Sequence, residues 1–299
     1  MASDIIWKYP EAIKDCKWLI DNLSSTNTRI FDCTTHLHYT DDNPKKPYDV
    51  ESGLKDYIKS HIPNAALIDL QLDLSENDSS YKFTIPKMQD LIDRLKQLGI
   101  GHPYHIVLYA RNGLQWATRV WWIIRSAGFQ NVSVLDGGFT EWCHLGLPVE
   151  TGENRFSPAQ FEPEDPLALF VGKKSVLEGM ENKNSILLNA LTSDIHSGQS
   201  ARYGRPGHIP SSQNIPFHEF LDPDTGKLKP PSEAQAILEE HEINGDVSIV
   251  NYCGGGIAAT LNAFVMMQLG YQHLEIYDNS MSEWAMDETL PIATCPVTS

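Results

Sequence analysis

The sequence predicts an α/β protein of two domains, each a parallel sheet flanked by helices. The chain has 299 residues, which suits two domains at the usual ~150 residues per domain. Short apolar runs of strand type alternate with helical patterns, as in βαβ units that form a parallel sheet. The order of these elements is the same in both halves of the chain. We therefore expect a duplicated domain rather than an array of short repeats, which have periods of roughly 20–50 residues.

The clearest repeat consists of two segments, residues 106–142 and 249–284. Each starts with an apolar strand run, which is followed by a glycine-containing turn and an apolar helical stretch. Each then has a second strand run, VSVLD or LEIYD, and closes on Glu-Trp. Aligning Tyr109 with Tyr252 places Ala110 opposite Cys253. The two copies therefore share an order of elements but differ at the residue that ends the first strand.

A shorter repeat lies upstream of each copy, HIPNAALIDL at 61–70 and GHIPSSQNIPF at 207–217. Between the two halves, residues 151–172 carry three prolines and several acids without a clear period, which is typical of a linker. We therefore expect a first domain at 1–150, a linker at 151–172 and a second domain at 173–299.

Composition excludes several classes of partner. The formal net charge is −16, which argues against a nucleic acid or an anionic membrane surface as a partner. No window approaches the ~20 apolar residues of a membrane helix. The first residues, MASDIIWKYPEAIKDCKW, resemble neither a secretory signal nor an Arg-rich transit peptide. We expect a cytoplasmic monomer that binds neither nucleic acid nor a membrane.

The cysteine pattern argues against a disulfide framework, because the five cysteines are odd in number, widely spaced and without a CxxC motif. His36 and His38 form a short pair, but no cluster of ligands at zinc spacing accompanies them, so we expect no metal and no cofactor. We expect Cys16 and Cys33 to be packing residues. We expect Cys143 and Cys295 to be exposed thiols without a role in the chemistry.

Cys253 differs from the other cysteines because it lies between a buried strand run and a glycine-rich helix start. Glycines allow a tight turn with several N–H groups pointing inward, and a helix N-terminus adds about half a positive charge. Both features favour a thiolate, and the same amides could hold the anionic outer sulfur of a persulfide. The expected anion-binding loop consists of Gly254, Gly255, Gly256, Ile257 and Ala258. The residues alone leave open a buried structural cysteine, which is common in protein cores.

Three motifs accompany this repeat: GHIP at 207–210, NYCGGGIA at 251–258 and YDNSMSEW at 277–284. Together they resemble the tandem-domain rhodaneses, which include thiosulfate and 3-mercaptopyruvate sulfurtransferases, over nearly the whole chain. The resemblance implies two rhodanese-like domains, with Cys253 as the nucleophile and a non-catalytic first domain that has Ala110 in its place. It also implies a ping-pong reaction. The cysteine takes sulfur from a small-molecule donor as a persulfide and passes it to a thiol, a thioredoxin-like protein or cyanide.

The loop departs from the family's patterns. Members that prefer mercaptopyruvate tend to read Cys-Gly-Ser/Thr-Gly, whereas those that prefer thiosulfate tend to have basic residues after the cysteine. This chain reads Cys-Gly-Gly-Gly, so Gly255 lacks the hydroxyl of the family's Cys-Ser-Asp triad, and Gln71, with Asp69 and Asp73 beside it, aligns with the triad's aspartate. We expect 3-mercaptopyruvate as the favoured donor and thiosulfate as the alternative. We also expect Gly255→Ser to raise turnover with mercaptopyruvate, unless the backbone there has a positive φ.

Arginines are the family's ligands for the mercaptopyruvate carboxylate. One of the two expected positions is Ile195 here, and the other corresponds to Arg202, with Arg205 nearby. A guanidinium suits a carboxylate or a sulfonate-like oxyanion because of its fork of donors. We expect Arg202 and Arg205 to bind the substrate, with a solvated surface loop as the alternative.

Two other functions compete with sulfur transfer. A cysteine phosphatase of the rhodanese-like type needs an arginine in a C-x5-R pattern, but the corresponding residue after Cys253 is Ala259. An inactive binding module is the second alternative, and the presence of Cys253 argues against it.

Overall fold

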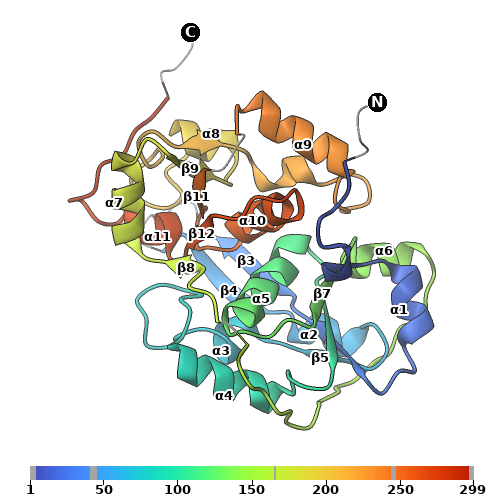
Figure 1. The fold of residues 1–299 in the computed structure, drawn as a ribbon. Helices are drawn as coiled ribbons and strands as arrows, with labels where there is room; N and C mark the ends of the chain where they lie inside the picture. Colours follow the sequence, from blue (N-terminus) through green and yellow to red (C-terminus); the bar gives the residue numbers. More distant parts are fainter. Residues whose placement is uncertain (1–4, 41–45, 165, 244–246, 296–299) are drawn as a thin grey trace.

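The computed structural model of the chain describes residues 5–40, 46–164, 166–243 and 247–295. It contains two five-stranded sheets, and the paired strands within each sheet all run parallel. Helices flank each sheet, as Figure 1 shows. The predicted fold class, α/β with two parallel sheets flanked by helices, is confirmed.

The first sheet has the strand order β1-β7-β6-β2-β5. Its strands are β1 (Ile13–Lys14), β2 (Thr28–Asp32), β5 (Ala65–Leu67), β6 (His105–Tyr109) and β7 (Val132–Leu135). The helices of this half are α1 (Cys16–Asn22), α2 (Leu54–Lys59), α3 (Leu70–Asp73), α4 (Met88–Leu98), α5 (Leu114–Ser126) and α6 (Gly138–His144), after a 3-10 turn at Pro10–Ala12. The central strands are buried along nearly their whole length, as expected for strands with helices on both faces.

The second sheet has the order β10-β9-β11-β12-β8. Its strands are β8 (Phe170–Val171), β9 (Ser185–Asn189), β10 (Gln213–Asn214), β11 (Ser248–Tyr252) and β12 (Leu274–Tyr277). The helices are α7 (Lys173–Glu181), α8 (Ser193–Ser197), α9 (Pro231–Glu240), α10 (Ala258–Gln268) and α11 (Ser280–Trp284), with a 3-10 turn at Phe217–Phe220. No helix among the described residues is both long and apolar enough to cross a lipid bilayer.

The two sheets agree in detail as well as in strand order. The amide of Cys33, just after β2, donates to the carbonyl of Tyr109 at 2.7 Å. The amide of Ala190, just after β9, donates in the same way to the carbonyl of Tyr252 at 2.8 Å. The alignment of Tyr109 with Tyr252 therefore matches the hydrogen bonding of the two domains.

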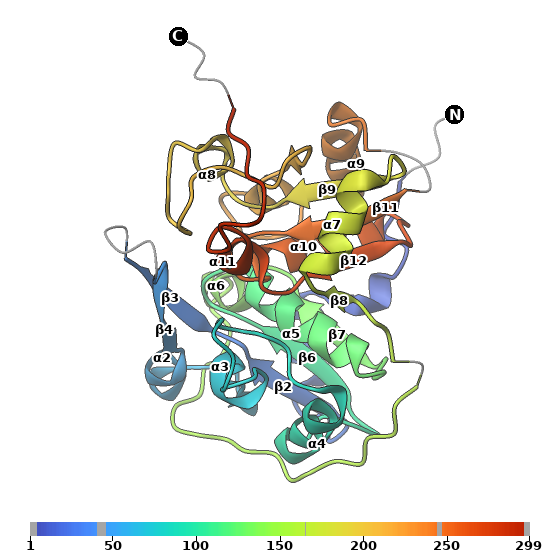
Figure 2. The same cartoon turned by 90° about the vertical axis from the view of Figure 1, so that its left-hand side faces the viewer.

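One element of the first domain has no counterpart among the described residues of the second. An antiparallel hairpin, β3 (Thr35–Tyr39) with β4 (Tyr48–Ser52), follows β2 directly. Figure 2 shows this hairpin beside the boundary between the two sheets. It brings Tyr48 into ring contact with Tyr203 of the second domain, with centroids 6.5 Å apart. This hairpin was not predicted from the sequence.

The segment expected as a linker, residues 151–172, packs against the first domain and ends in the second sheet. Phe161 is buried, and Phe156 makes an edge contact with Phe31 at 5.1 Å between centroids. Figure 2 shows this stretch running around the far side of the first domain. Its last residues form β8, which pairs with β12, so the second sheet begins inside the segment expected as a linker.

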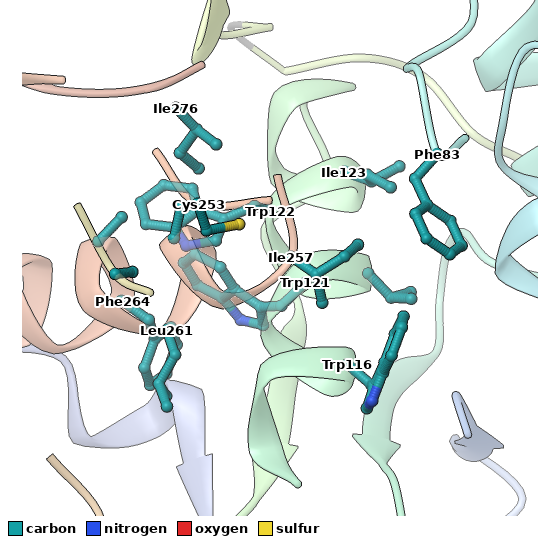
Figure 3. Packing of buried hydrophobic residues seen from close by; sticks show 14 of the residues in the cluster. Phe83, Trp116, Trp121, Trp122, Ile123, Cys253, Ile257, Leu261, Phe264 and Ile276 are labelled. Carbon is teal, nitrogen blue, oxygen red and sulfur yellow. The ribbon is translucent and has the colours of Figure 1, made fainter. Parts of the chain in front are cut away.

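The two domains are joined by the packing of α5 against α10. The hydroxyls of Thr118 and Thr260 lie 2.9 Å apart, and Trp122 Nε1 donates to the carbonyl of Thr260 at 2.9 Å. Trp121 makes an edge contact with Phe264 at 5.0 Å between centroids, and Figure 3 shows both rings in this cluster. One buried core therefore runs through both domains and includes Cys253, which Figure 3 shows among these side chains.

Candidate active site at the domain interface

Cys253 lies directly after β11, where its backbone is fixed by the start of α11. It is 2% exposed. Its amide donates to Ser280 Oγ at 3.0 Å, and that hydroxyl donates to the carbonyl of Tyr277 at 2.7 Å. The carbonyl of Cys253 accepts from the amide of Met281 at 3.0 Å. The strand end and the helix start therefore hold the cysteine backbone from both sides.

The loop after Cys253 is held through its carbonyl groups, which leaves its amides available. The carbonyl of Gly254 accepts from Ser282 N at 2.8 Å, and the carbonyl of Gly256 accepts from Arg119 at 3.1 Å. Gly256 has φ +72°, and a Cβ there would collide with the carbonyl oxygen of Asp278. Within the described part of the chain, no group accepts from the backbone N–H groups of residues 254–258. Because α10 starts at Ala258, these amides and the helix N-terminus form an anion-binding cradle.

Tyrosines occupy the space beside the first two glycines of the loop. A Cβ on Gly254 would collide with the hydroxyl of Tyr203, and a Cβ on Gly255 would lie 2.6 Å from the hydroxyl oxygen of Tyr48. The φ of Gly255 is outside the positive range, so backbone strain is not the obstacle. Gly255→Ser therefore meets no backbone strain, but the new side chain would begin where the hydroxyl of Tyr48 lies, so that hydroxyl would have to move.

Cys253 opens into a cavity of about 230 Å³ that both domains line. The first domain contributes Leu37, Tyr39, Tyr48, Asn112, Gln115 and Trp116, and the second contributes Leu191, Tyr203, Phe217, Cys253, Gly254, Gly255, Ile257 and Ala258. No lysine, arginine, aspartate or glutamate is among these lining residues. The cavity therefore offers hydroxyls, amides and apolar surface to a substrate rather than charged side chains.

The three tyrosines of the cavity are neutral hydrogen-bond donors. Burial raises the pKa of Tyr39, Tyr48 and Tyr203, and a negative charge on Cys253 raises each pKa further. Each phenol therefore keeps its proton at physiological pH. A neutral O–H near an anionic sulfur can stabilise it without an ion pair.

The two arginines expected at the substrate have different positions. Arg205 donates to the carbonyls of Trp284, Ala285, Asp287 and Leu290 at 2.7–3.1 Å. Four of its five N–H groups therefore donate to backbone carbonyls at the end of α11 and just after it. The expectation that Arg205 binds substrate is wrong, because these N–H groups are already used. Arg202 lies over the ring of Tyr39, 4.1 Å from the centroid. It does not line the cavity itself but contacts a residue that does.

The residues aligned with the family's triad aspartate lie elsewhere. Gln71 Oε1 accepts from the amide of Phe83 at 3.2 Å, and Asp69 caps α3 by accepting from Leu72 N at 3.0 Å. Asp69 and Asp73 line a separate cavity in the first domain. Ile195, at the other arginine position, is buried. None of these side chains reaches the cavity of Cys253, so no loop hydroxyl and no carboxylate replace the triad there.

The equivalent place in the first domain keeps the geometry without the thiol. The carbonyl of Ala110 accepts from Phe139 N at 3.0 Å, as the carbonyl of Cys253 accepts from Met281 N. Arg111 follows, with its guanidinium 3.8 Å from the centroid of Phe139 and 3.5 Å from the carboxylate of Asp32. The first domain therefore keeps this backbone arrangement but has no thiol at the equivalent position.

The other cysteines lie away from this cavity. Burial raises the pKa of Cys16 to about 11 and the pKa of Cys33 well above its ordinary value, and desolvation also raises the pKa of Cys143. Cys295 is exposed and lies with His196 and His208 in a cluster of possible metal ligands. The amide of Asn189, whose oxygen is fixed by Leu191 N, donates to Nδ1 of His196 at 3.1 Å. A neutral His196 therefore keeps its proton on Nε2, which disfavours metal binding there.

Both halves of the chain match the Rhodanese-like domain family, over residues 15–145 and 174–287. The 3-mercaptopyruvate sulfurtransferase of Mus musculus is 31% identical over 287 residues, covering 92% of each chain. The thiosulfate sulfurtransferase of Mus musculus is 29% identical over 283 residues, covering 91% of each chain. Among solved structures, the 3-mercaptopyruvate sulfotransferase SseA from Escherichia coli has a TM-score of 0.76 at 22% identity, covering 92% of this chain and 99% of that one.

The matches to these named sulfurtransferases cover nearly the full length of both chains. The chain is therefore a sulfurtransferase, as its motifs predicted. The family matches cover most of both sheets and include the loop that holds Cys253. Sequence, fold and repeat agree, and the chain belongs to the rhodanese family.

Proposed function

We propose that this enzyme takes sulfane sulfur from 3-mercaptopyruvate on Cys253 and passes it to a thiol, a thioredoxin-like protein or cyanide. The observation that carries this proposal is the position of Cys253. It is the one described cysteine that lines a cavity between the domains and precedes a loop with unused amides. The raised pKa values of Cys16, Cys33 and Cys143 make those thiols poor nucleophiles.

The reaction balances without a cofactor. The Cys253 thiolate attacks the sulfur of mercaptopyruvate, and the carbon–sulfur bond breaks. The electron pair stays on the carbon as the enolate of pyruvate, which then takes up a proton. The acceptor thiolate or cyanide next attacks the outer sulfur, and Cys253 leaves as a thiolate. The loop amides support both halves, since they can stabilise an anionic sulfur at each stage.

The charge of the cavity supports mercaptopyruvate over thiosulfate. Because no charged side chain lines it as it stands, the groups that face an anion there are hydroxyls, amides and the helix N-terminus. Taking a dianion such as thiosulfate out of water costs more than taking a monocarboxylate. Relatives with either name have similar identity to the chain, so thiosulfate remains the second candidate. Arg202 is the arginine we still propose for the carboxylate, through a shift of its side chain from Tyr39 into the cavity.

The division of the chain is also proposed: a non-catalytic domain at 1–150, a linker at 151–172 and a catalytic domain at 173–299. We propose a monomer, because the cavity is lined from within one chain. All five cysteines are free, which supports a reducing compartment such as the cytoplasm.

Mass spectrometry after incubation with each donor tests the proposal. We expect mercaptopyruvate to add one sulfur atom to the peptide that contains Cys253. Cys253→Ser is expected to lose transfer by several orders of magnitude, while Cys16→Ala and Cys143→Ala transfer sulfur normally. Full transfer by Cys253→Ser contradicts the assignment of the nucleophile. A faster reaction with thiosulfate than with mercaptopyruvate contradicts the proposed donor.

A further inference from the structure

The hydroxyl of Tyr48 occupies the place where a side chain of residue 255 would begin. A Cβ on residue 255 would lie 2.6 Å from this oxygen and 3.8 Å from Ser282 Oγ. Tyr48 opens strand β4 of the first domain and lines the same cavity as Cys253. The absence of a side chain at Gly255 therefore makes room for a phenol from the other domain.

The ring of Tyr48 is held in this position by aromatic contacts. It stacks on Phe83 with an interplanar angle of 20° and makes edge contacts with Tyr39 and Tyr203. Phe83 is itself fixed, because its carbonyl accepts from Arg119 at 2.6 Å. With 4% of Tyr48 exposed, the hydroxyl cannot swing into solvent. A donor held before the reaction starts stabilises a developing charge without a cost of reorganisation.

The buried hydroxyl oxygen of the neighbouring Ser282 has no hydrogen-bond partner of good geometry among the described residues. Burial raises the pKa of Tyr48 by more than its polar contact with Ser282 lowers it. The phenol is therefore protonated at neutral pH. Two hydroxyls thus lie near Gly255, and of these two residues Tyr48 lines the cavity.

We propose that Tyr48 donates a hydrogen bond to the anionic sulfur on Cys253, and thereby supplies from the first domain the hydroxyl that the loop lacks. This inference rests on the function proposed above. The outer sulfur of a Cys253 persulfide would extend into the cavity beside Gly255, within reach of the phenol. The proton stays on the tyrosine oxygen throughout, so Tyr48 lowers the energy of the sulfur anion and undergoes no net change.

Tyr48→Phe tests this role, because it removes the oxygen and keeps the ring contacts. We expect the rate of Cys253 persulfide formation with mercaptopyruvate to fall by about 10²-fold, the usual effect of losing one such donor. The midpoint of the pH profile for alkylation of Cys253 should move upward, which a purely structural role would not cause. Tyr57→Phe is the matched control. Its buried hydroxyl donates to the carbonyl of Ala65 in the same domain, away from the cavity, so persulfide formation should be unchanged.

Two double variants decide whether the hydroxyl itself matters. Gly255→Ser alone should be slow, because its Cβ collides with Tyr48. In the Tyr48→Phe background the space is open, so Gly255→Ser should recover most of the lost rate, whereas Gly255→Ala should fill the space without recovering it. Equal rates for the two double variants, or a wild-type rate and alkylation profile for Tyr48→Phe, would overturn the proposal. If the wild-type protein itself forms no persulfide with any donor, the proposed function fails first, and that outcome is distinct from these.

Discussion

Arg119 of the first domain and Asp278 of the second form a buried ion pair with 2.6 Å between guanidinium nitrogen and carboxylate oxygen. Arg119 is fully buried and also donates to the carbonyl of Gly256 in the loop after Cys253. Asp278 accepts in turn from the amide of Ile85 at 2.8 Å. The same group of contacts therefore holds the two domains together and fixes the loop.

Asp278→Asn should destabilise the contact between the domains and loosen the loop after Cys253. The substitution leaves the charge of Arg119 buried without its counter-ion, which costs roughly 3 kcal/mol or more in unfolding free energy. Urea unfolding at pH 7 measures this loss, and sulfur transfer should fall because Gly256 loses its support. An unchanged unfolding midpoint would show that the carbonyl acceptors alone satisfy Arg119.

The duplication repeats this arrangement with the domains exchanged. Asp136 of the first domain accepts from the amide of Leu228 of the second at 2.8 Å, as Asp278 accepts from Ile85. Asp136 differs from Asp278 in its charged partner, however. Lys227, the cation near Asp136, forms its ion pair with Glu141 at 2.6 Å. Burial accordingly raises the pKa of Asp136 to about 6, so this carboxylate is poorly compensated.

Asp136→Asn should therefore change the free energy of unfolding in the opposite direction from Asp278→Asn. The pKa of an aspartate in an unfolded chain is about 3.9, below the folded value of about 6. The folded state binds more protons between these values, so the contribution of Asp136 to stability falls as pH rises from about 4 to about 6. Asparagine does not titrate and can still accept from Leu228. Urea unfolding at several pH values should show the variant gaining stability relative to wild type across this window. A difference that does not vary with pH would contradict the raised pKa.

The sequence predicted the features that depend on repetition and periodicity. The strand runs before Ala110 and Cys253 and the helices after them were visible as buried apolar patterns, and their alignment matches the observed hydrogen bonding. The glycines after Cys253 indicated a turn into a helix. These are local signals, since they depend on residues close together in the chain.

The sequence did not reveal contacts between distant segments. Nothing near Tyr48 indicates that its hydroxyl lies against Gly255, because the hairpin that carries it is mostly polar and has weak strand periodicity. Arg205 looked like a substrate ligand because it is a cation beside the GHIP motif. Its carbonyl partners come from residues 284–290, and only the fold brings them together.

Gly254→Ala should reduce activity with both donors together. Its Cβ would collide with the hydroxyl of Tyr203, which is 5% exposed and cannot move aside freely. A displacement of the loop by about 1 Å costs on the order of 10²-fold in rate. Gly172→Ala is the matched control, because nothing lies within 4 Å of its Cβ and its φ is not positive. Steady-state kinetics with mercaptopyruvate and thiosulfate measure both effects. Loss with only one donor would indicate altered specificity instead of a displaced loop.

Separating the domains should inactivate the second one, for a reason that lies in α10. This helix is buried on nearly all sides, and one of those sides is covered by α5 of the first domain. A fragment of residues 173–299 exposes that apolar side and also lacks β8, the edge strand that pairs with β12. We expect it to bind a dye for exposed apolar surface and to transfer sulfur poorly, because Tyr48, Asn112 and Trp116 are missing from its cavity. A fragment that starts at residue 167 keeps β8, so it should unfold at higher urea than the shorter one while remaining equally inactive. Wild-type turnover by both fragments would show that the first domain does not contribute to the active site. Wild-type turnover by the longer fragment, with an inactive shorter one, would show that β8 is required and the first domain is not.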